Sequence, residues 1–327
     1  MLNSIYIEIT DACNLNCSFC PCGKGPDGVQ NAPAGGGRQR VRNFMSSELF
    51  ERCIGEAAKQ AQNVYFHILG EPTLHPGFVH YLKALEATPL KLNLTTNGTT
   101  IARVGDHLLE STALRQVNFS THAFGELETD LAEKYLQGVL DFCQMALVKR
   151  PDLYINLRLW NAGNFPDADR QKAWNRFFLE RVQRVFGSSL ADEQPSLPSP
   201  EHFCSRHKSF PVKGRLYLHQ DSRFEWPELD EWTLSYRSAP GPQSASRVTD
   251  VKGTCHALET HMGILHDGRV VACCLDHQGI ITLGNIQEQS LEQVLKSPLA
   301  KTLREGFKRH ELRHPLCKSC SYCRRFK

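Results

Sequence analysis

Three closely spaced cysteines near the start of the chain have the residue type and the spacing to hold an iron–sulfur cluster. Cys13, Cys17 and Cys20 form the pattern C-x3-C-x2-C. A four-iron cluster normally takes four thiolates, so three cysteines would leave one iron open to another ligand. An open iron indicates chemistry rather than a structural role. The spacing alone leaves two alternatives, a structural zinc site and a chance group of buried thiols.

A second group of cysteines lies near the C-terminus and predicts a second metal site. Cys255 is followed after twelve residues by Gly268 and after four more by Cys273. A long gap then leads to Cys317, Cys320 and Cys323, which are separated by two residues each. Pairs spaced C-x2-C bind zinc as readily as iron–sulfur clusters, so a zinc ribbon stays open as the alternative here.

The segments around the first cysteines are predicted to alternate between strands and helices. The apolar run 5–9, just before these cysteines, is predicted to be a strand. Further strands are predicted at 64–69, 91–96, 116–120, 153–160 and 215–219. Helical periodicity falls between them, at about 46–58, 77–87, 130–148 and 170–186. Such alternation predicts a parallel sheet with crossover helices and with functional loops at the carboxyl ends of the strands.

One predicted strand, 153–160, has a polar face. Asn156, Arg158 and Trp160 alternate there with three apolar residues. The interior of an ordinary α/β barrel is apolar and packed, so inward-pointing Asn156 and Arg158 would indicate a ligand in the lumen. The alternative is that Arg158 forms a salt bridge across the barrel.

The strand at 64–69 ends in Gly70-Glu71-Pro72, one strand–helix unit after the cysteines. Together with C-x3-C-x2-C and Phe19 before the last cysteine, this resembles the radical S-adenosylmethionine (SAM) superfamily. The resemblance implies an α/β fold, a partial (β/α)6 TIM-like barrel. It also implies a [4Fe-4S] cluster on Cys13, Cys17 and Cys20, whose free iron binds SAM and whose electron cleaves it to a 5′-deoxyadenosyl radical.

The same resemblance implies which residues would contact SAM. Gly70, Glu71 and Pro72 would meet the methionine amino group, and Asn97 belongs to a strand-to-turn signature that is common in the family. Ser120 would hydrogen-bond the ribose, although a lone serine reads equally well as structural. Arg158 could hold the SAM carboxylate.

The C-terminal cysteines resemble the auxiliary-cluster region called SPASM or, when shortened, twitch. This implies a small α+β domain with a hairpin at 262–273 and a helix at 290–307, and a second [4Fe-4S] auxiliary cluster on Cys255, Cys273, Cys317 and Cys320. The chain ends four residues after Cys323, so the further cluster of the full form is not expected. Cys274 and Cys323 stay unassigned, and Cys22 is interpreted as a loop residue.

Asp276 follows the hairpin and resembles the acidic residue that some relatives use as a general base. We list it as the candidate catalytic residue. A carboxylate beside a cluster could be tuned for proton removal, but a turn residue at the end of a hairpin would look the same in the sequence.

The composition limits the kinds of partner and the cellular location that we expect for this protein. The chain has 327 residues, 41% of them hydrophobic, with a net charge of +3 spread over mixed charges, which gives no direct nucleic-acid signal. No apolar run reaches the ~20 residues of a membrane span, and no signal peptide is recognised, so we expect a cytoplasmic protein. Thirteen cysteines in such a chain read as metal ligands. The polar stretch 23–42 is predicted to be a long loop bordering the site.

We expect three parts: a radical SAM core over 1–220, a bridge over 221–254 and an auxiliary-cluster domain over 255–327. The first functional hypothesis is a radical SAM oxidoreductase or maturase acting on a small molecule or a peptide, with a reductant such as flavodoxin or ferredoxin. The second is a radical SAM lyase or modification enzyme acting on a small heterocycle or nucleoside. The third is a non-catalytic iron–sulfur electron carrier or sensor, which would not need Gly70-Glu71-Pro72.

Overall fold

The structure is a computed structural model that describes residues 1–23, 42–162, 168–187, 209–227, 229 and 251–326. The predicted loop at 23–42 and the bridge at 221–254 therefore fall largely outside the described residues. No helix in the described ranges combines the length and the apolar character needed to cross a membrane.

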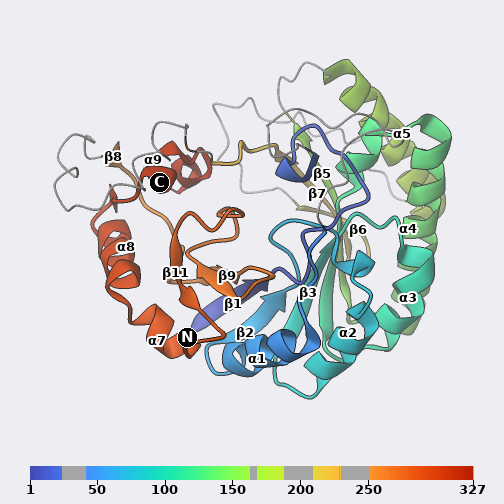
Figure 1. Cartoon of the computed structure of the whole chain (residues 1–327). Coiled ribbons are helices and arrows are strands. Elements are labelled where there is room, and N and C mark those ends of the chain that lie inside the picture. Colours follow the sequence, from blue (N-terminus) through green and yellow to red (C-terminus); the bar gives the residue numbers. More distant parts are fainter. Residues whose placement is uncertain (24–41, 163–167, 188–208, 228, 230–250, 327) are drawn as a thin grey trace.

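Six parallel strands form the centre of the fold, in the order in which the chain makes them. They are β1 (Leu2–Ile7), β2 (Ala61–Tyr65), β3 (Lys91–Thr96), β4 (Leu114–Phe119), β5 (Tyr154–Ala162) and β7 (Leu216–Ser222). The sheet curves but does not close, because β11 (Thr282–Asn285) and β6 (Ser209–Lys213) remain as its two edges (Figure 1). The predicted partial six-stranded barrel is confirmed.

Helices cover the outer face of this sheet (Figure 1). They are α1 (Ser47–Ala57), α2 (Phe78–Glu86), α3 (Ile101–Glu110), α4 (Thr129–Lys149) and α5 (Ala168–Phe186). Ser46 caps α1, because its hydroxyl accepts a hydrogen bond from the backbone N–H of Leu49 at 3.2 Å. The apolar members of β5, such as Leu157 and Leu159, are fully buried under the helices, so the polar members face the lumen.

Both edges of the sheet carry strands that the sequence did not place there. β6 (Ser209–Lys213) pairs antiparallel with β7. At the other edge β9 (His261–Ile264) runs parallel to β1, with Ser4 opposite His261 and Ile7 opposite Ile264. The C-terminal cysteine region is therefore built directly onto the sheet that carries the first cysteines.

The predicted hairpin at 262–273 is confirmed. β9 and β10 (Arg269–Val271) pair antiparallel, and β11 (Thr282–Asn285) follows on β10. Gly268 in the turn has φ +85°, a conformation that residues with a side chain rarely adopt.

The single helix predicted at 290–307 is wrong. The structure has α7 (Leu291–Leu295) and α8 (Pro298–Lys308) instead. The Ser297 hydroxyl accepts a hydrogen bond from the Ala300 N–H, and Pro298 occupies the first turn, where its missing N–H is harmless. These residues start a new helix. Beyond it lie β12 (Glu311–Leu312), which pairs with β8 (Val251–Lys252), and α9 (Pro315–Ser319).

One buried ion pair joins the C-terminal hairpin to the core. Glu8, at the end of β1, is 2% exposed, and its Oε1 lies 2.9 Å from Nδ1 of His266 in the hairpin turn. Its Oε2 accepts a hydrogen bond at 3.0 Å from the N–H of Leu69, just before Gly70. The hydrogen bond to Glu8 raises the pKa of His266 above 6.5, with Asp11 and Asp267 acting in the same direction.

We expect this pair to give a pH-dependent part of the stability. Because the pKa of His266 is higher in the folded chain, its contribution is complete below about pH 6.5 and is lost as the pH rises through the raised value. The difference in unfolding free energy between the wild type and His266→Gln should shrink by up to about 1 kcal/mol from pH 6 to pH 8.5. Urea titrations at both pH values measure it. A difference that grows with pH would contradict the assignment.

Candidate functional site

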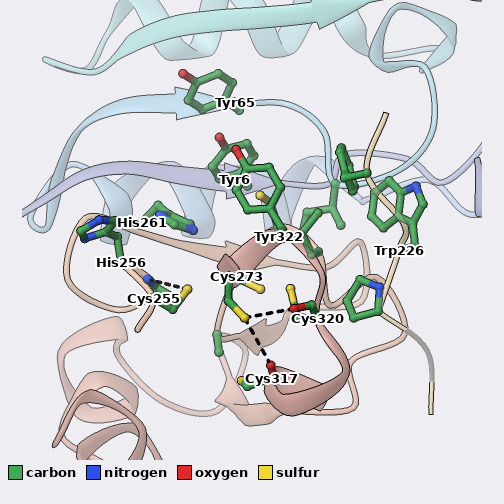
Figure 2. Close-up of a pocket in the computed structure, with 18 of the residues that line it drawn as sticks. Tyr6, Tyr65, Trp226, Cys255, His256, His261, Cys273, Cys317, Cys320 and Tyr322 are labelled. Atoms are coloured by element: carbon green, nitrogen blue, oxygen red, sulfur yellow. Dashed lines mark hydrogen bonds between the residues drawn. The ribbon is translucent and has the colours of Figure 1, made fainter. Parts of the chain in front are cut away.

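A cavity of about 630 Å³ opens at the carboxyl ends of the parallel strands, between the core and the C-terminal region. Residues from both cysteine groups line it: Cys20 from the first, and Cys255, Cys273, Cys317 and Cys320 from the second. Figure 2 shows the four C-terminal cysteines on one side of this space and Tyr6, Tyr65 and Tyr322 on the other. The predicted ligands of two separate clusters thus border one chamber.

The loop with the first cysteines follows β1 and is held from two directions. The Asp11 carboxylate accepts hydrogen bonds from the backbone N–H and the side-chain amide of Asn43, at 2.8 and 2.7 Å. The Glu126 carboxylate accepts from the backbone N–H and the hydroxyl of Ser18, at 2.7 and 2.8 Å. Ser18 lies between Cys17 and Cys20, so Glu126 fixes the middle of the motif.

Burial controls the chemistry of these thiols. It raises the pKa of Cys13 to about 12, and the pKa of Cys17 is raised further. Thiolates at these positions need the positive charge of a bound metal to form at neutral pH. Within the described ranges no three Cys, His, Asp or Glu side chains converge as ligands of a single metal ion. The donor set, soft sulfur on a chamber wall, fits a cluster.

The Gly70-Glu71-Pro72 turn lies directly against the cysteine loop. Gly70 has φ +75°, and a Cβ there would collide with the carbonyl oxygen of Thr10, so only glycine fits. The Glu71 N–H donates to the Ala12 carbonyl at 2.7 Å, and the Gly70 N–H donates to the buried Cys22 Sγ at 3.3 Å. Cys22 therefore packs under this turn, in keeping with its interpretation as a non-ligand.

Glu71 is 2% exposed, and its carboxylate accepts hydrogen bonds within the protein. Oε1 accepts from the hydroxyls of Thr73 and Thr96, and Oε2 accepts from the Asn97 N–H at 2.5 Å. Burial raises the pKa of Glu71, and these bonds oppose that shift. The side chain thus joins the turn after β2 to the end of β3.

Asn97 and Ser120 lie at the ends of the next two strands. The Asn97 side-chain amide lies 3.9 Å from the Cys13 Sγ and donates to the side-chain Oδ1 of Asn14 at 3.0 Å. Asn97 thus lies at the first cysteine motif. Ser120 lines the cavity where β4 gives way to η3 (Thr121–Glu126).

Arg158 lies on β5 and lines the cavity, as the polar face of that strand predicts. Its guanidinium carbon lies 4.5 Å from the centroid of the Trp160 ring. Burial lowers the pKa of Arg158 to about 10, so the group stays protonated at neutral pH. The side-chain amide of Asn156, two residues earlier, donates to the side-chain Oδ1 of Asn118 at 2.9 Å.

The second cysteines come from three segments. Cys255 precedes β9 and accepts from the Ala257 N–H at 3.4 Å, Cys273 follows β10, and Cys317 and Cys320 lie on and just after α9. Burial raises the pKa of Cys255, Cys273 and Cys317. The unassigned Cys323 and Cys274 also line the cavity. A hydrogen bond from Cys323 lowers the pKa of Cys320 to about 6. Cys274 forms a hydrogen bond with the side chain of Tyr6.

Asp276 does not line the cavity. It is 1% exposed, and its two carboxylate oxygens accept from the Ile280 and Ile281 N–H groups at 2.8 and 2.6 Å. These bonds hold the turn that leads from β10 to β11. The described contacts are those of a turn residue.

Several cavity residues escaped sequence reasoning. Tyr6 on β1 stacks on Tyr65 of β2 with ring centroids 4.4 Å apart, and Tyr322 comes from η6 (Tyr322–Arg325) near the C-terminus. His67 follows β2, two positions after Tyr65. Polar and aromatic residues alternate with apolar ones along β1 and β2, as they do along β5. The same pattern could therefore have indicated that these strands face a ligand in the lumen. Glu126 gave no signal, since a single glutamate after a strand is common.

Glu126→Gln should loosen the first cysteine loop. The amide keeps the volume but replaces a carboxylate that accepts from Ser18 and pairs with Arg223 at 3.3 Å. Hydrogen bonds to charged groups contribute about 1.5–3 kcal/mol. We expect the iron content of the first site to fall by about half or more after equal reconstitution, with the second site unchanged. Glu180→Gln, an exposed residue of α5, serves as control. Equal iron contents would contradict the positioning role.

Comparison with known families gives two matches. Residues 7–147 match the radical SAM superfamily, and residues 255–324 match the SPASM iron–sulfur cluster-binding domain. The two matches cover the segments with the two cysteine groups, in the predicted order.

Two curated relatives match parts of the chain. A probable GTP 3′,8-cyclase of Pyrococcus horikoshii is 29% identical over 158 residues, 48% of this chain and 46% of the relative. A tungsten-containing aldehyde ferredoxin oxidoreductase cofactor-modifying protein of Pyrococcus furiosus is 29% identical over 111 residues, 33% of this chain and 27% of the relative. The chain thus aligns with less than half the length of either relative.

Among solved structures, Streptococcus suis SuiB bound to S-adenosylmethionine is similar in fold. The TM-score is 0.54 at 16% identity, over 98% of this chain and 72% of SuiB. At this identity the likeness concerns the fold alone.

Proposed function

Because the chain belongs to the radical SAM superfamily and carries a SPASM region, we propose that it abstracts a hydrogen atom from a substrate held in the cavity between its two cysteine groups. It is a radical SAM enzyme. Its cofactors are SAM, the SAM-binding [4Fe-4S] cluster and an auxiliary iron–sulfur cluster. When bound, they supply the electron that cleaves SAM and the 5′-deoxyadenosyl radical that attacks the substrate.

The observation that carries the proposal is the shared cavity. Cys20 and four C-terminal cysteines border it together, so a substrate there would lie between the SAM site and the auxiliary site. Cys255, Cys273, Cys317 and Cys320 would hold the auxiliary cluster beside this space, where it would supply an electron acceptor for an oxidation. We therefore propose an oxidoreductase or maturase, supplied by a reductant such as flavodoxin or ferredoxin.

Within this proposal each group of residues has a separate task. Cys13, Cys17 and Cys20 hold the first cluster, and the turn formed by Gly70, Glu71 and Pro72 holds SAM together with Asn97 and Ser120. Cys255, Cys273, Cys317 and Cys320 hold the auxiliary cluster. Asp276 receives no catalytic role, because its carboxylate is occupied by the backbone of its own turn.

A lyase or modification enzyme acting on a small heterocycle is the second candidate. The aromatic side chains around the cavity favour it, since rings stack on rings. The probable GTP 3′,8-cyclase among the relatives acts on a heterocycle according to its name.

Anaerobic incubation of the reconstituted protein with dithionite and SAM tests the proposal. We expect 5′-deoxyadenosine together with methionine. Absence of both, with the clusters intact, would favour the electron-carrier hypothesis instead. Once a substrate is found, the redox balance of its product separates the two candidates: an oxidation releases two electrons per product, and a lyase releases none.

A further inference from the structure

The lining of the cavity includes arginine but no carboxylate side chain among the described residues. The two arginines are Arg158 and Arg223. Arg223 is neutralised, because its guanidinium lies 3.3 Å from the Glu126 carboxylate. Arg158 is left as the uncompensated charge.

Arg158 has no carboxylate within ion-pair distance in the described part of the chain. Its polar contact there is to the Thr95 hydroxyl, at 3.5 Å from Nη1. The guanidinium lies over the Trp160 ring, and a stacked arginine keeps its planar edge of N–H donors free for a carboxylate or phosphate. A half-buried guanidinium that lines a cavity without a carboxylate partner is suited to bind an anion there.

His67 provides a second, independent sign of a ligand. Its Nδ1 is shielded from solvent and has no hydrogen-bond partner among the described residues. Its ring makes T-shaped contacts with the rings of Tyr6 and Tyr65, at centroid distances of 5.6 and 5.8 Å. Since an unpaired buried polar atom costs about 1–3 kcal/mol, a partner is expected when the site is filled.

The walls near these two residues are flat. Tyr6 and Tyr65 are stacked with their planes 7° apart, and the Tyr322 ring faces the same space from the C-terminal segment (Figure 2). Trp160 and Trp226 also line the cavity. Aromatic walls of this kind hold planar rings by stacking and exclude water from the charged end of a ligand.

We propose that the substrate is a planar aromatic or heterocyclic molecule with a carboxylate or phosphate group, its anion bound by Arg158 and a ring N–H or hydroxyl by His67. This rests on the proposed function and names the substrate class of that same cavity. Arg158 then serves the substrate rather than the SAM carboxylate. Its charge interacts with Tyr6, Tyr65 and Tyr322, which face the chamber, and none of its described contacts reaches the Gly70-Glu71-Pro72 turn.

Binding of matched probes tests this without turnover. The pairs are indole-3-acetate with indole-3-acetamide and guanosine 5′-monophosphate with guanosine, measured by anaerobic equilibrium dialysis against the SAM-loaded protein. We expect at least one anion to bind about tenfold or more tightly than its neutral partner. The pair that shows the preference tells carboxylate from phosphate.

Single substitutions show which residue causes the preference for the anionic probe. Arg158→Gln should abolish the preference, Arg158→Lys should keep part of it, and His67→Phe should weaken both members of a pair alike. Arg215→Gln is the matched control, since Arg215 also lies over an aromatic ring, that of Tyr154, but outside the cavity. Iron content and circular dichroism establish that each variant is folded and loaded.

Three results would overturn the proposal. They are failure of both anions to bind the wild type, equal binding of anion and neutral partner, and a preference that survives in Arg158→Gln. If Arg158→Gln instead weakens the SAM-induced spectral change of the cluster and leaves the probe pairs unchanged, Arg158 holds the SAM carboxylate. Failure of the proposed function would appear differently, as absence of 5′-deoxyadenosine with probe binding intact.

Discussion

Replacing Cys13, Cys17 and Cys20 together by alanine is expected to abolish SAM cleavage while about four irons per chain remain after reconstitution. All three thiols lie in the loop after β1, outside the packed core, so the fold should persist. The second cysteines come from segments after residue 254 and share none of these ligands. Iron and sulfide analysis with a 5′-deoxyadenosine assay measures both effects.

The control for this variant is Cys143→Ala. Cys143 is fully buried in α4, on the outer side of the sheet, and lies in neither cysteine group. It should retain both the iron of the wild type and SAM cleavage. An iron content near zero in the triple variant, with the protein folded, would contradict the assignment of two separate sites.

The double variant Cys255→Ala/Cys273→Ala should uncouple SAM cleavage from product formation. Removing two of four thiolates leaves too little ligation to hold a cluster, even with spare thiols nearby. SAM would still meet its own cluster, so 5′-deoxyadenosine should form at a rate within about threefold of the wild type. Substrate turnover should fall by about a hundredfold or more, since the radical intermediate loses its electron acceptor.

Single variants of the unassigned cysteines provide the comparison. The Cys323 thiol donates a hydrogen bond to the backbone carbonyl of Cys320 at 3.0 Å, and Cys274 forms a hydrogen bond with Tyr6. Each is therefore interpreted as a neighbour of the auxiliary site and not as a ligand. Cys323→Ala and Cys274→Ala should therefore be milder than the double variant. Full iron content and normal product in the double variant would show that the region does not hold the cluster through these cysteines.

The sequence predicted those parts of the fold whose cause is local. β3 was predicted at its observed bounds, and the helices at 46–58 and 130–148 were placed within a residue or two, because their apolar periods are long. The error at 290–307 was also local in cause: the Ser297-Pro298 pair stops one helix and starts another. An apolar period that continues across such a break conceals it.

The joining of β9 to β1 could not be predicted in this way. These strands lie more than 250 residues apart in the chain, and their pairing depends on which edge of the core sheet is free. The same limit applies to the cavity. Cysteine spacing predicted two groups of ligands, but only the fold brings them to one chamber with Tyr6, Tyr322 and His67.

Side chains that hold neighbouring segments in place by hydrogen bonds were the hardest to assign from the sequence. Glu71 was interpreted from its motif as a SAM contact, and its carboxylate is instead engaged by Thr73, Thr96 and the Asn97 N–H. Glu126 was not noticed, although it holds the cysteine loop through Ser18. Hydrogen bonds of this kind leave no periodic trace in a sequence.

The central claim is that this chain holds two clusters that open on one cavity. Pulsed electron paramagnetic resonance of the fully reduced protein tests it most directly, because two paramagnetic clusters at such close range broaden each other's signals and speed up their relaxation. We predict that this coupling is present in the wild type and absent in both the triple and the double cysteine variants. Two signals without coupling, or one cluster accompanied by bound zinc, would contradict the claim.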